Sequence, residues 1–465
     1  MEEQYAKTKR LSLIESVFYN NAFILTQGFL LTGLALQFGV TESILAVLGM
    51  LPVMAQVFQL GVPLLLRKIG SRKSAMIFSA SISRPVLLLL PILILLGWKN
   101  QYILVGILAV FAIFNGFTGN FWISLMRDII PNEKSGRYHG LRNLLISLSS
   151  MTMLFIYSLT LDTFNESLGF VIISIIGASF SIVTYFILRR FEDPPRKQYQ
   201  SKKLFSVVLN DWNFKRFLAF SFFWNFAIAL ANPFFPYFQL VNLKLSYSYL
   251  SIMSIIAGGV SILFYFIWGR LSDKIGHQSV AEFGIFSAAF TAIMWLFVNQ
   301  ATVQTLLPVD AILTGVNWSA INLALFTIML NIVDPALTET YFAVLAFVNG
   351  MGAFAGALAG GFAATFLKEI NFELFGIPFF GIQILFITTG ILRMFSWLLL
   401  KRVKTKKVIS VSRFAFNAIS VLGRRGPVRP YENSLIISKL KSLLVERPKK
   451  KKNEKEKEND DSNNI

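Results

Sequence analysis

The sequence of 465 residues contains no cysteine and only two histidines. The lack of cysteine excludes disulfide bonds and thiolate metal sites. His139 and His277 both lie in charged segments between long apolar runs, and no cluster of potential metal ligands accompanies them. The phosphate-binding pattern GxxxxGK[ST] is also missing. We therefore expect no bound metal, no cofactor and no direct use of ATP.

Charge is scarce as well, at 15% of the residues, whereas 54% are hydrophobic. A soluble domain carries about a quarter charged residues. The charges cluster and leave ten long charge-free runs, with two further runs interrupted only by Arg84 and by Arg393. Because a membrane-crossing helix needs about 20 apolar residues, these runs predict an all-α integral membrane protein with twelve spans. The runs are 16–41, 43–66, 74–98, 100–126, 143–161, 167–188, 217–243, 245–269, 283–309, 311–333, 340–367 and 374–400.

The basic residues predict the orientation of these spans. Nearly all Lys and Arg residues fall in the termini and the even-numbered loops, and the other side holds only Lys99, Lys244 and Lys368. Loops rich in Lys and Arg stay cytoplasmic. We therefore expect a multi-pass protein of the cell (plasma or inner) membrane with both termini in the cytoplasm. The net charge of +19 follows from this asymmetry and needs no nucleic-acid partner.

A charged segment with two prolines, 189–203, separates two groups of six spans. The predicted organisation is an N-terminal six-helix bundle (1–190), a cytoplasmic linker (191–215), a C-terminal six-helix bundle (216–400) and a basic, partly disordered tail (401–465). The halves share KIG at 68–70 and 274–276, and TGNFW at 118–122 matches TGVNW at 314–318. Such a duplication is common among transporters. In the tail, 434–445 either forms a helix on anionic membrane lipids or is disordered.

The stretch WGRLSDKIGH, 268–277, places charges between two glycines after a long apolar run. It resembles the signature G-x-L-[SA]-D-x-x-G-[RK] of the major facilitator superfamily, and the twelve spans in two halves also resemble that family. The resemblance implies two pseudo-symmetric six-helix bundles and a loop that latches them together on the cytoplasmic side. Glycines permit a tight turn, and the acid would accept hydrogen bonds at a helix N-terminus. The implied latch residues are Gly269, Arg270, Asp273, Lys274 and Gly276.

A second segment, RDIIPNEKSGR at 127–137, is similar to the D-x-x-P-x(4–6)-G-R pattern of many family members. It adds Asp128 and Arg137 to the implied gating residues. In the first-half copy of the signature, Arg67 takes the position of the acid. Asp128 is therefore a candidate partner for Arg67.

Amide side chains suggest where the interior of the membrane domain lies. Asn and Gln are costly within a membrane unless they face protein or water, and they gather in the spans that line the central path in the family, the first, fourth, seventh and tenth. An equally good interpretation makes them contacts between helices. The candidates for the substrate cavity are Asn20, Gln27, Arg84, Asn115, Thr118, Trp122, Asn225, Asn232, Thr314, Asn317 and Trp318.

Two arginines interrupt otherwise uncharged spans. Arg84 lies eleven residues after Lys73, near the middle of the membrane. It would either cap backbone carbonyls of a neighbouring helix or face the cavity and bind an anionic group of the substrate. Arg393 lies eight residues before Lys401, and we expect it to reach the membrane interface by snorkelling.

The sequence thus predicts a secondary transporter, expected to be a monomer, that moves a small organic solute by alternating access. Proton or sodium coupling would supply the energy. A flippase or exporter of lipids or amphiphiles with the same fold is the alternative. A membrane-embedded transferase is the alternative of another class, but no nucleophile or metal-ligand spacing supports an enzyme, and we identify no catalytic residue.

Overall fold

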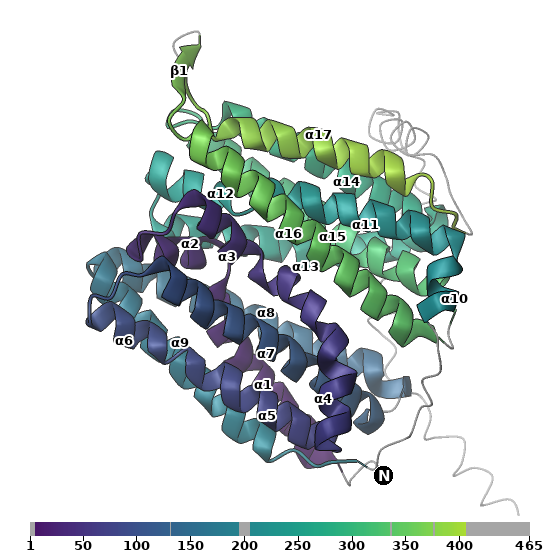
Figure 1. Ribbon diagram of the computed structural model, residues 1–465. Coiled ribbons are helices and arrows are strands. Elements are labelled where there is room, and N and C mark those ends of the chain that lie inside the picture. The colour runs from purple at the N-terminus through teal and green to yellow at the C-terminus, as the bar shows by residue number, and fades with distance from the viewer. Residues whose placement is uncertain (1–4, 131, 195–204, 335–336, 375–376, 406–465) are drawn as a thin grey trace, which may run out of the picture. The chain divides into compact units, whose positions relative to one another are not determined.

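A computed structural model describes residues 5–130, 132–194, 205–334, 337–374 and 377–405 (Figure 1). In this part of the chain, eleven helical segments are long and apolar enough to cross a membrane. The short apolar helix α2 (Gly28–Gln37) completes a further span, the first. The predicted all-α membrane fold is therefore confirmed. The predicted tail helix, 434–445, lies outside the described residues.

The described residues of the first half form nine α-helices in chain order. They are α1 (Ala6–Phe23), α2 (Gly28–Gln37), α3 (Glu42–Met54), α4 (Val62–Ile69), α5 (Arg72–Val86), α6 (Leu89–Leu95), α7 (Gln101–Ile129), α8 (Asn132–Thr163) and α9 (Glu166–Arg189). Helices α1 with α2, α3 with α4, and α5 with α6 are pairs that each form one interrupted span. Pro52 lies inside α3 and Pro85 inside α5, where a missing N–H weakens the helix and favours such an interruption.

The second half begins with the short helix α10 (Phe205–Asn210). It continues with α11 (Trp212–Ala231), α12 (Phe234–Tyr237), α13 (Tyr247–Ile275), α14 (His277–Met294), α15 (Val303–Ile332), α16 (Thr338–Leu367) and α17 (Gln383–Leu400). Between α16 and α17, strands β1 (Asn371–Leu374) and β2 (Ile377–Phe380) form an antiparallel hairpin, which is the only β-structure in the described residues. The seventh span starts at Trp212, within the segment predicted as linker.

Local sequence signals explain where several helices begin and end. The side chains of Asn100, Asn165 and Asp211 accept hydrogen bonds from the first amides of α7, α9 and α11, the role for which short polar residues are favoured. Helix α13 ends at Gly276, whose φ of 96° is available to glycine at little cost. Helix α14 starts at the next residue, so Gly276 alone forms the turn.

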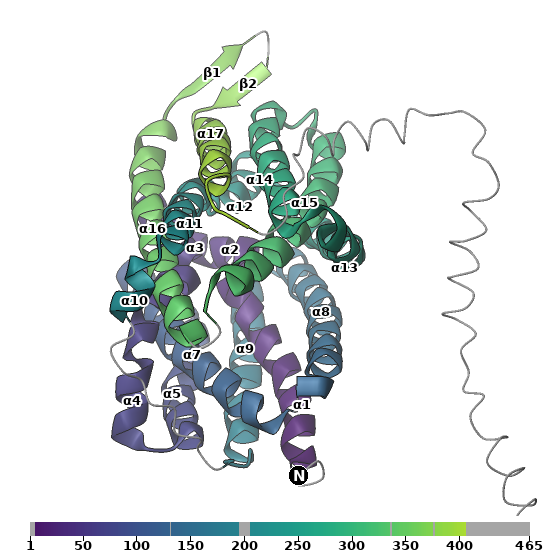
Figure 2. The same cartoon turned by 90° about the vertical axis from the view of Figure 1, so that its right-hand side faces the viewer.

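Successive spans alternate in direction, so the loops fall on two faces. The N-terminal face carries the start of α1 and, because of this alternation, the turns that follow α4 and α13. The opposite face carries the β-hairpin, at the top of Figure 2. The halves meet where α3 packs on α16 and α8 packs on α13, and α2 contacts α12 near the centre. Helices α2 and α3 therefore lie at the boundary between the halves.

Glycines let α16 pack closely on α11. A Cβ atom added at Gly352 would lie 2.5 Å from the carbonyl oxygen of Phe222, and added Cβ atoms at Gly356 and Gly360 would also collide with the α11 backbone, at Phe226 and Leu230. Small residues at four-residue spacing permit this kind of backbone approach in membrane helices. The stripe keeps α11 close to α16 and so fixes the wall of the cavity described next.

Candidate substrate cavity

Two adjoining cavities lie between the halves. The first, of about 450 Å³, and the second, of about 500 Å³, share Gly28, Gly49, Asn232 and Trp318 in their walls. The two glycines belong to the first half and the other two residues to the second. Both volumes fall within the range of about 300–1,000 Å³ that is usual for small-molecule sites.

The first cavity contains an acidic and a basic side chain. Arg393 of α17 is 5% exposed and donates from Nη1 to the carbonyl oxygen of Ala288 at 3.0 Å. Asp310 of α15 accepts at Oδ1 from Nε1 of Trp295 at 2.9 Å. Both residues line the cavity, and no ion pair joins these two described side chains. Arg393 does not snorkel as expected, because neighbouring helices enclose it and supply an acceptor.

Helix α15 contributes a polar stripe to the same wall. Asp310, Thr314 and Asn317 all line the first cavity, at the spacing that places residues on one helix face. Asn317 is 1% exposed and donates from Nδ2 to Oγ1 of Thr291 at 3.0 Å. Its buried Oδ1 accepts no hydrogen bond. The stripe thus offers unused acceptor atoms to whatever occupies the cavity.

The second cavity has an amide pair in its wall. Asn225 of α11 donates from Nδ2 to Oδ1 of Asn349 on α16 at 3.0 Å, and both residues line the cavity. Trp224 and Trp318 lie nearby, with ring centroids 6.0 Å apart. This wall is therefore aromatic and polar, as the amide pattern predicts for the central path.

The first span is broken where it meets both cavities. Gln27 has extended backbone angles and Gly28 has a φ of 56°, so the helix stops at Thr26 and restarts as α2. Gly28 lines both cavities and Gln27 lines the second. Non-helical backbone at membrane depth is tolerated where it borders protein or a water-filled cavity. The break leaves the first amides of α2 without intrahelical partners at this site.

Apart from Gln27, the candidates of the first half line neither of these two cavities. Arg84 is 2% exposed, donates from Nη1 to Oδ1 of Asn115 at 2.9 Å and lies 4.8 Å from the ring centre of Tyr19. Nδ2 of Asn115 donates to the Tyr19 hydroxyl at 2.9 Å. Arg84 therefore contacts a side-chain amide of its own half, rather than backbone carbonyls or the described cavities.

The other candidates of the first half also contact neighbouring helices. Asn20 donates to Oγ of Ser150 on α8, and Trp122 donates from Nε1 to Oγ of Ser12 at 3.2 Å. Thr118 is buried and bonds the carbonyl of Phe114 in its own helix. Apart from Gln27, the amide candidates of this half mark contacts between helices, the second of the two interpretations.

The implied latch residues lie at the N-terminal face. Asp273 and Arg270 are exposed on the last turns of α13, and Asp273 has no hydrogen-bond or ion-pair partner in the described part of the chain. Gly269 lies inside α13, so its expected role at a helix end is wrong. The Lys274 side chain lies outside the described residues, and Arg137 is exposed on α8. Asp128 pairs with Arg72 at 2.6 Å, not with Arg67 as suggested.

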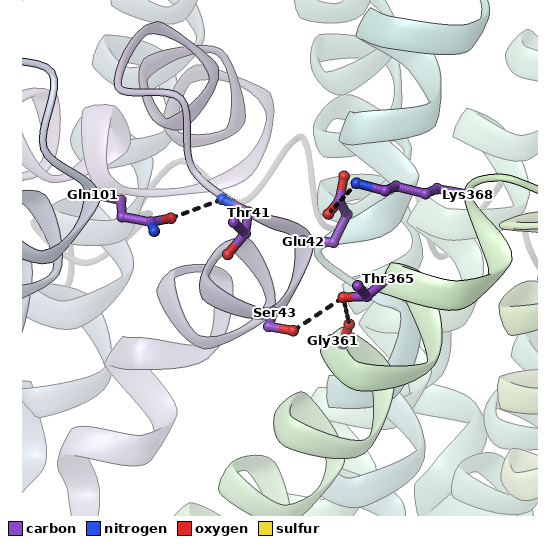
Figure 3. A network of polar contacts seen from close by, with 7 residues as sticks. All are labelled: Thr41, Glu42, Ser43, Gln101, Gly361, Thr365 and Lys368. Atoms are coloured by element: carbon purple, nitrogen blue, oxygen red, sulfur yellow. Dashed lines mark hydrogen bonds and ion pairs between the residues drawn. The ribbon is translucent and has the colours of Figure 1, made fainter.

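Polar contacts hold the halves together at the opposite face (Figure 3). Oε2 of Glu42 lies 3.2 Å from Nζ of Lys368, and the hydroxyls of Ser43 and Thr365 are 3.2 Å apart. The carboxylate of Asp162 on α8 accepts from the backbone amides of Tyr247 and Ser248 at the start of α13, at 2.9 and 2.7 Å. These contacts join described residues of the two halves at this face.

Sequence reasoning missed the acid, the base and these closing contacts. Neither Asp310 nor Arg393 is among the cavity candidates from the sequence, although a lone ionisable residue beside an apolar run is itself a signal of a functional site. Glu42 and Lys368 are likewise single charges at the margins of long uncharged runs. Their pairing depends on the contact between the halves, which no local pattern encodes.

Two bundles of membrane helices around a cavity define a class of polytopic transport proteins. The family model described as Major Facilitator Superfamily matches residues 11–357, and the chain belongs to this superfamily. No curated protein matches the sequence.

Solved structures show the same fold at low sequence identity. The nucleoside transporter NupG is 14% identical, with a TM-score of 0.64 over 86% of this chain and 99% of that one. A D-xylose-proton symporter is 11% identical, with a TM-score of 0.65 over 87% and 99%. A bacterial homologue of the human lysosomal transporter Spinster, inward-facing and unoccupied, is 15% identical, with a TM-score of 0.60 over 86% and 96%.

Proposed function

We propose that the protein is a secondary transporter that moves a small organic solute by alternating access, with both termini in the cytoplasm. The observation that carries this proposal is the pair of adjoining cavities whose walls come from both halves. The cavity size and the unused polar groups suit a hydrogen-bonding solute. Membership of the superfamily and the nucleoside and sugar transporters among the similar structures support the same class. Coupling to protons or sodium would drive the transport.

We assign the structure to an inward-facing state. The polar contacts between the halves at the opposite face would close the outer entrance, whereas Asp273 and Arg270 are exposed at the N-terminal face. In the outward-facing state, the Asp273 carboxylate would accept hydrogen bonds from amides at a helix N-terminus of the other half. Arg270 and Lys274 of this latch would then pair with acids or lipid phosphates, with Arg137 and Asp128 on the first-half side.

The absence of cysteine allows a direct test of alternating access, because no native thiol can react with introduced cysteines. Ser43→Cys with Thr365→Cys would form a disulfide across the outer entrance, where the native hydroxyls are 3.2 Å apart. Proteoliposomes would be screened for uptake of labelled nucleosides, sugars, amino acids and organic anions. We expect oxidation to block uptake of the transported solute and reduction to restore it.

A matched control joins two helices of the same half. Asn21 and Ser149 are hydrogen bonded at 2.7 Å between α1 and α8, so Asn21→Cys with Ser149→Cys should cross-link without blocking uptake. Uptake that continues with the outer entrance locked would contradict alternating access. Movement of labelled lipids between the leaflets, without uptake of any soluble compound, would instead favour a flippase.

A further inference from the structure

We propose that the first cavity binds an amino acid in its zwitterionic form, with the ammonium group on the α15 stripe and the carboxylate on Arg393. This inference rests on the proposed transport function and names the substrate class. It starts from two opposite charges that line one cavity without pairing with each other.

The α15 stripe has the donor and acceptor pattern that an ammonium group requires. Oδ2 of Asp310, Oγ1 of Thr314 and Oδ1 of Asn317 are acceptors, and none of them has a hydrogen-bond partner among the described residues. The three residues occupy one helix face and line the same cavity. A primary ammonium group carries three N–H donors and no acceptor, so it can donate to both Asp310 and Thr314, which lie about one turn apart, whereas Asn317 lies about 10 Å along the helix from Asp310 and would meet another part of the solute.

Arg393 provides the complementary group. Only its Nη1 is engaged, with the Ala288 carbonyl oxygen, and its buried Nε has no partner. A guanidinium group binds a carboxylate through two of its N–H groups in parallel. A buried cation with unused donors is costly unless an anion or acceptor meets it. A solute carboxylate at this position would remove that cost.

The balance of charge distinguishes a zwitterion from other solutes. A simple anion would pair with Arg393 but would be repelled by Asp310. A simple cation would pair with Asp310 but would be repelled by Arg393. A neutral polyol could hydrogen bond to both groups but would supply an opposite charge to neither of them. A solute with both charges meets both groups, and its net charge of zero matches that of the Asp310 and Arg393 side chains together.

The remaining wall suits the side chain of an apolar or aromatic amino acid. Trp295, Trp318 and Phe235 line the cavity beside the charged groups. The ring centroids of Phe235 and Trp295 are 4.9 Å apart. A volume of about 450 Å³ holds a solute of this size. Aromatic residues also bind ammonium groups through their ring faces.

The test measures binding of the twenty amino acids to the purified full-length protein by thermal shift and calorimetry. The amino acid that binds best is then compared with its N-acetyl derivative, which lacks the ammonium group, and with its amide, which lacks the carboxylate. We expect the parent compound to bind at least about tenfold more tightly than either derivative, since each loses a charge-assisted hydrogen bond.

Two variants should change the relative affinities for the amide and the N-acetyl derivative in opposite directions. Asp310→Asn should weaken binding of the parent and the amide but spare the N-acetyl derivative. Arg393→Gln should weaken binding of the parent and the N-acetyl derivative but spare the amide. A purely structural role would not reverse the order of the derivatives. Lys99→Gln, which removes a charge from an exposed loop, should leave all affinities unchanged.

If Arg393→Gln or Asp310→Asn does not fold, Thr314→Val carries the test, because it removes one acceptor at nearly constant volume. It should weaken binding of the parent and the amide but not of the N-acetyl derivative. Equal binding of the parent, its N-acetyl derivative and its amide would overturn the inference. Uptake of a sugar or nucleoside, with no amino acid bound, would overturn it while leaving the transporter proposal intact. Specific amino-acid binding without uptake would support the site and count against transport.

Discussion

The two halves each bury one arginine in an otherwise uncharged span, and the two arginines have different surroundings. Arg84 donates to Asn115 and lies over Tyr19, and it lines neither described cavity. Arg393 donates to one backbone carbonyl and lines the first cavity with unused donors. Depth in the membrane is therefore a poor guide to the role of a buried charge. Each arginine donates once from Nη1 and keeps a buried Nε without a partner, so the difference is that Arg393 borders a described cavity and Arg84 does not.

The largest difference should appear in stability when each arginine is replaced by leucine. Arg84 donates to Asn115 and lies over the Tyr19 ring, so Arg84→Leu would remove both a charge-assisted hydrogen bond and a cation–π contact. We expect this variant to lose about 2–4 kcal/mol of unfolding free energy, of which about 1.5–3 kcal/mol comes from the hydrogen bond and the rest from the ring contact. Arg393→Leu should lose less and should abolish ligand binding. Equal losses of stability, measured by denaturant unfolding in detergent, would remove the distinction between the halves.

The signature loop gives a second comparison between the halves. Asp273 keeps the acid of the family pattern, whereas the first-half copy has Arg67 at that position. Asp273→Asn should slow transport and favour the inward-facing state by about 1.5–3 kcal/mol, the contribution of a hydrogen bond to a charged group. Expression and insertion should be unaffected, because Asp273 is exposed and its side chain has no hydrogen-bond or ion-pair partner among the described residues.

Spin-label distances across the N-terminal face would measure this shift. Arg67→Gln is the matched control and should change those distances less. Distances in Asp273→Asn that equal those of the unmodified protein would argue against the latch.

Amide side chains should behave differently in the two halves. Asn21 exchanges hydrogen bonds with Ser149, so Asn21→Ala should cost about 0.6–2 kcal/mol of stability and leave ligand affinity unchanged. Asn232 lines both cavities and its side chain has no partner among the described residues. Asn232→Ala should therefore lower affinity several-fold, for a loss of about 1 kcal/mol, with little effect on stability. A loss of stability without a loss of affinity in Asn232→Ala would show that the amides of the second half serve packing.

The smallest effect is expected at the outer entrance. The Glu42–Lys368 pair is partly exposed, with the lysine side chain 39% exposed, so it should contribute at most about 1 kcal/mol. Glu42→Gln should raise the outward-open population by up to about fivefold and leave overall stability nearly unchanged. Labelling of a cysteine introduced at Ser43 would report this opening. Unchanged labelling would place the closure in the Asp162 contacts instead.

The sequence predicted the spans well because hydrocarbon imposes a simple rule on length and charge. Most charge-free runs located a helix, although 283–309 extends into α15 and 374–400 begins in the β-hairpin. The residue types predicted a polar central path that Asn225, Asn232, Thr314 and Asn317 do line. The break at Gln27–Gly28 was not predicted, although a Gln-Gly pair inside an apolar run is its visible sign.

The roles of Arg84, Arg393 and Asp310 could not be predicted from single spans. Each depends on which residues of other helices come within hydrogen-bond distance, as Asn115 does for Arg84 and Ala288 for Arg393. The same holds for Asp128, whose partner is Arg72 and not Arg67, the candidate in the first-half copy of the signature. Helix packing decides these pairs, and the hydrophobic pattern does not encode it.

The cap that Asp162 provides for α13 also bears on how the protein is made. Ser246 caps α13 from its own half, whereas the amides of Tyr247 and Ser248 bond only to Asp162 of the first half. A ribosome synthesises residue 162 well before residue 247, so the acceptor is in place when the eighth span enters the membrane. The first amides of α13 gain these hydrogen bonds only when the eighth span packs on the fifth. Packing of the second half on the first during synthesis is thereby favoured over arrangements that leave these amides without partners.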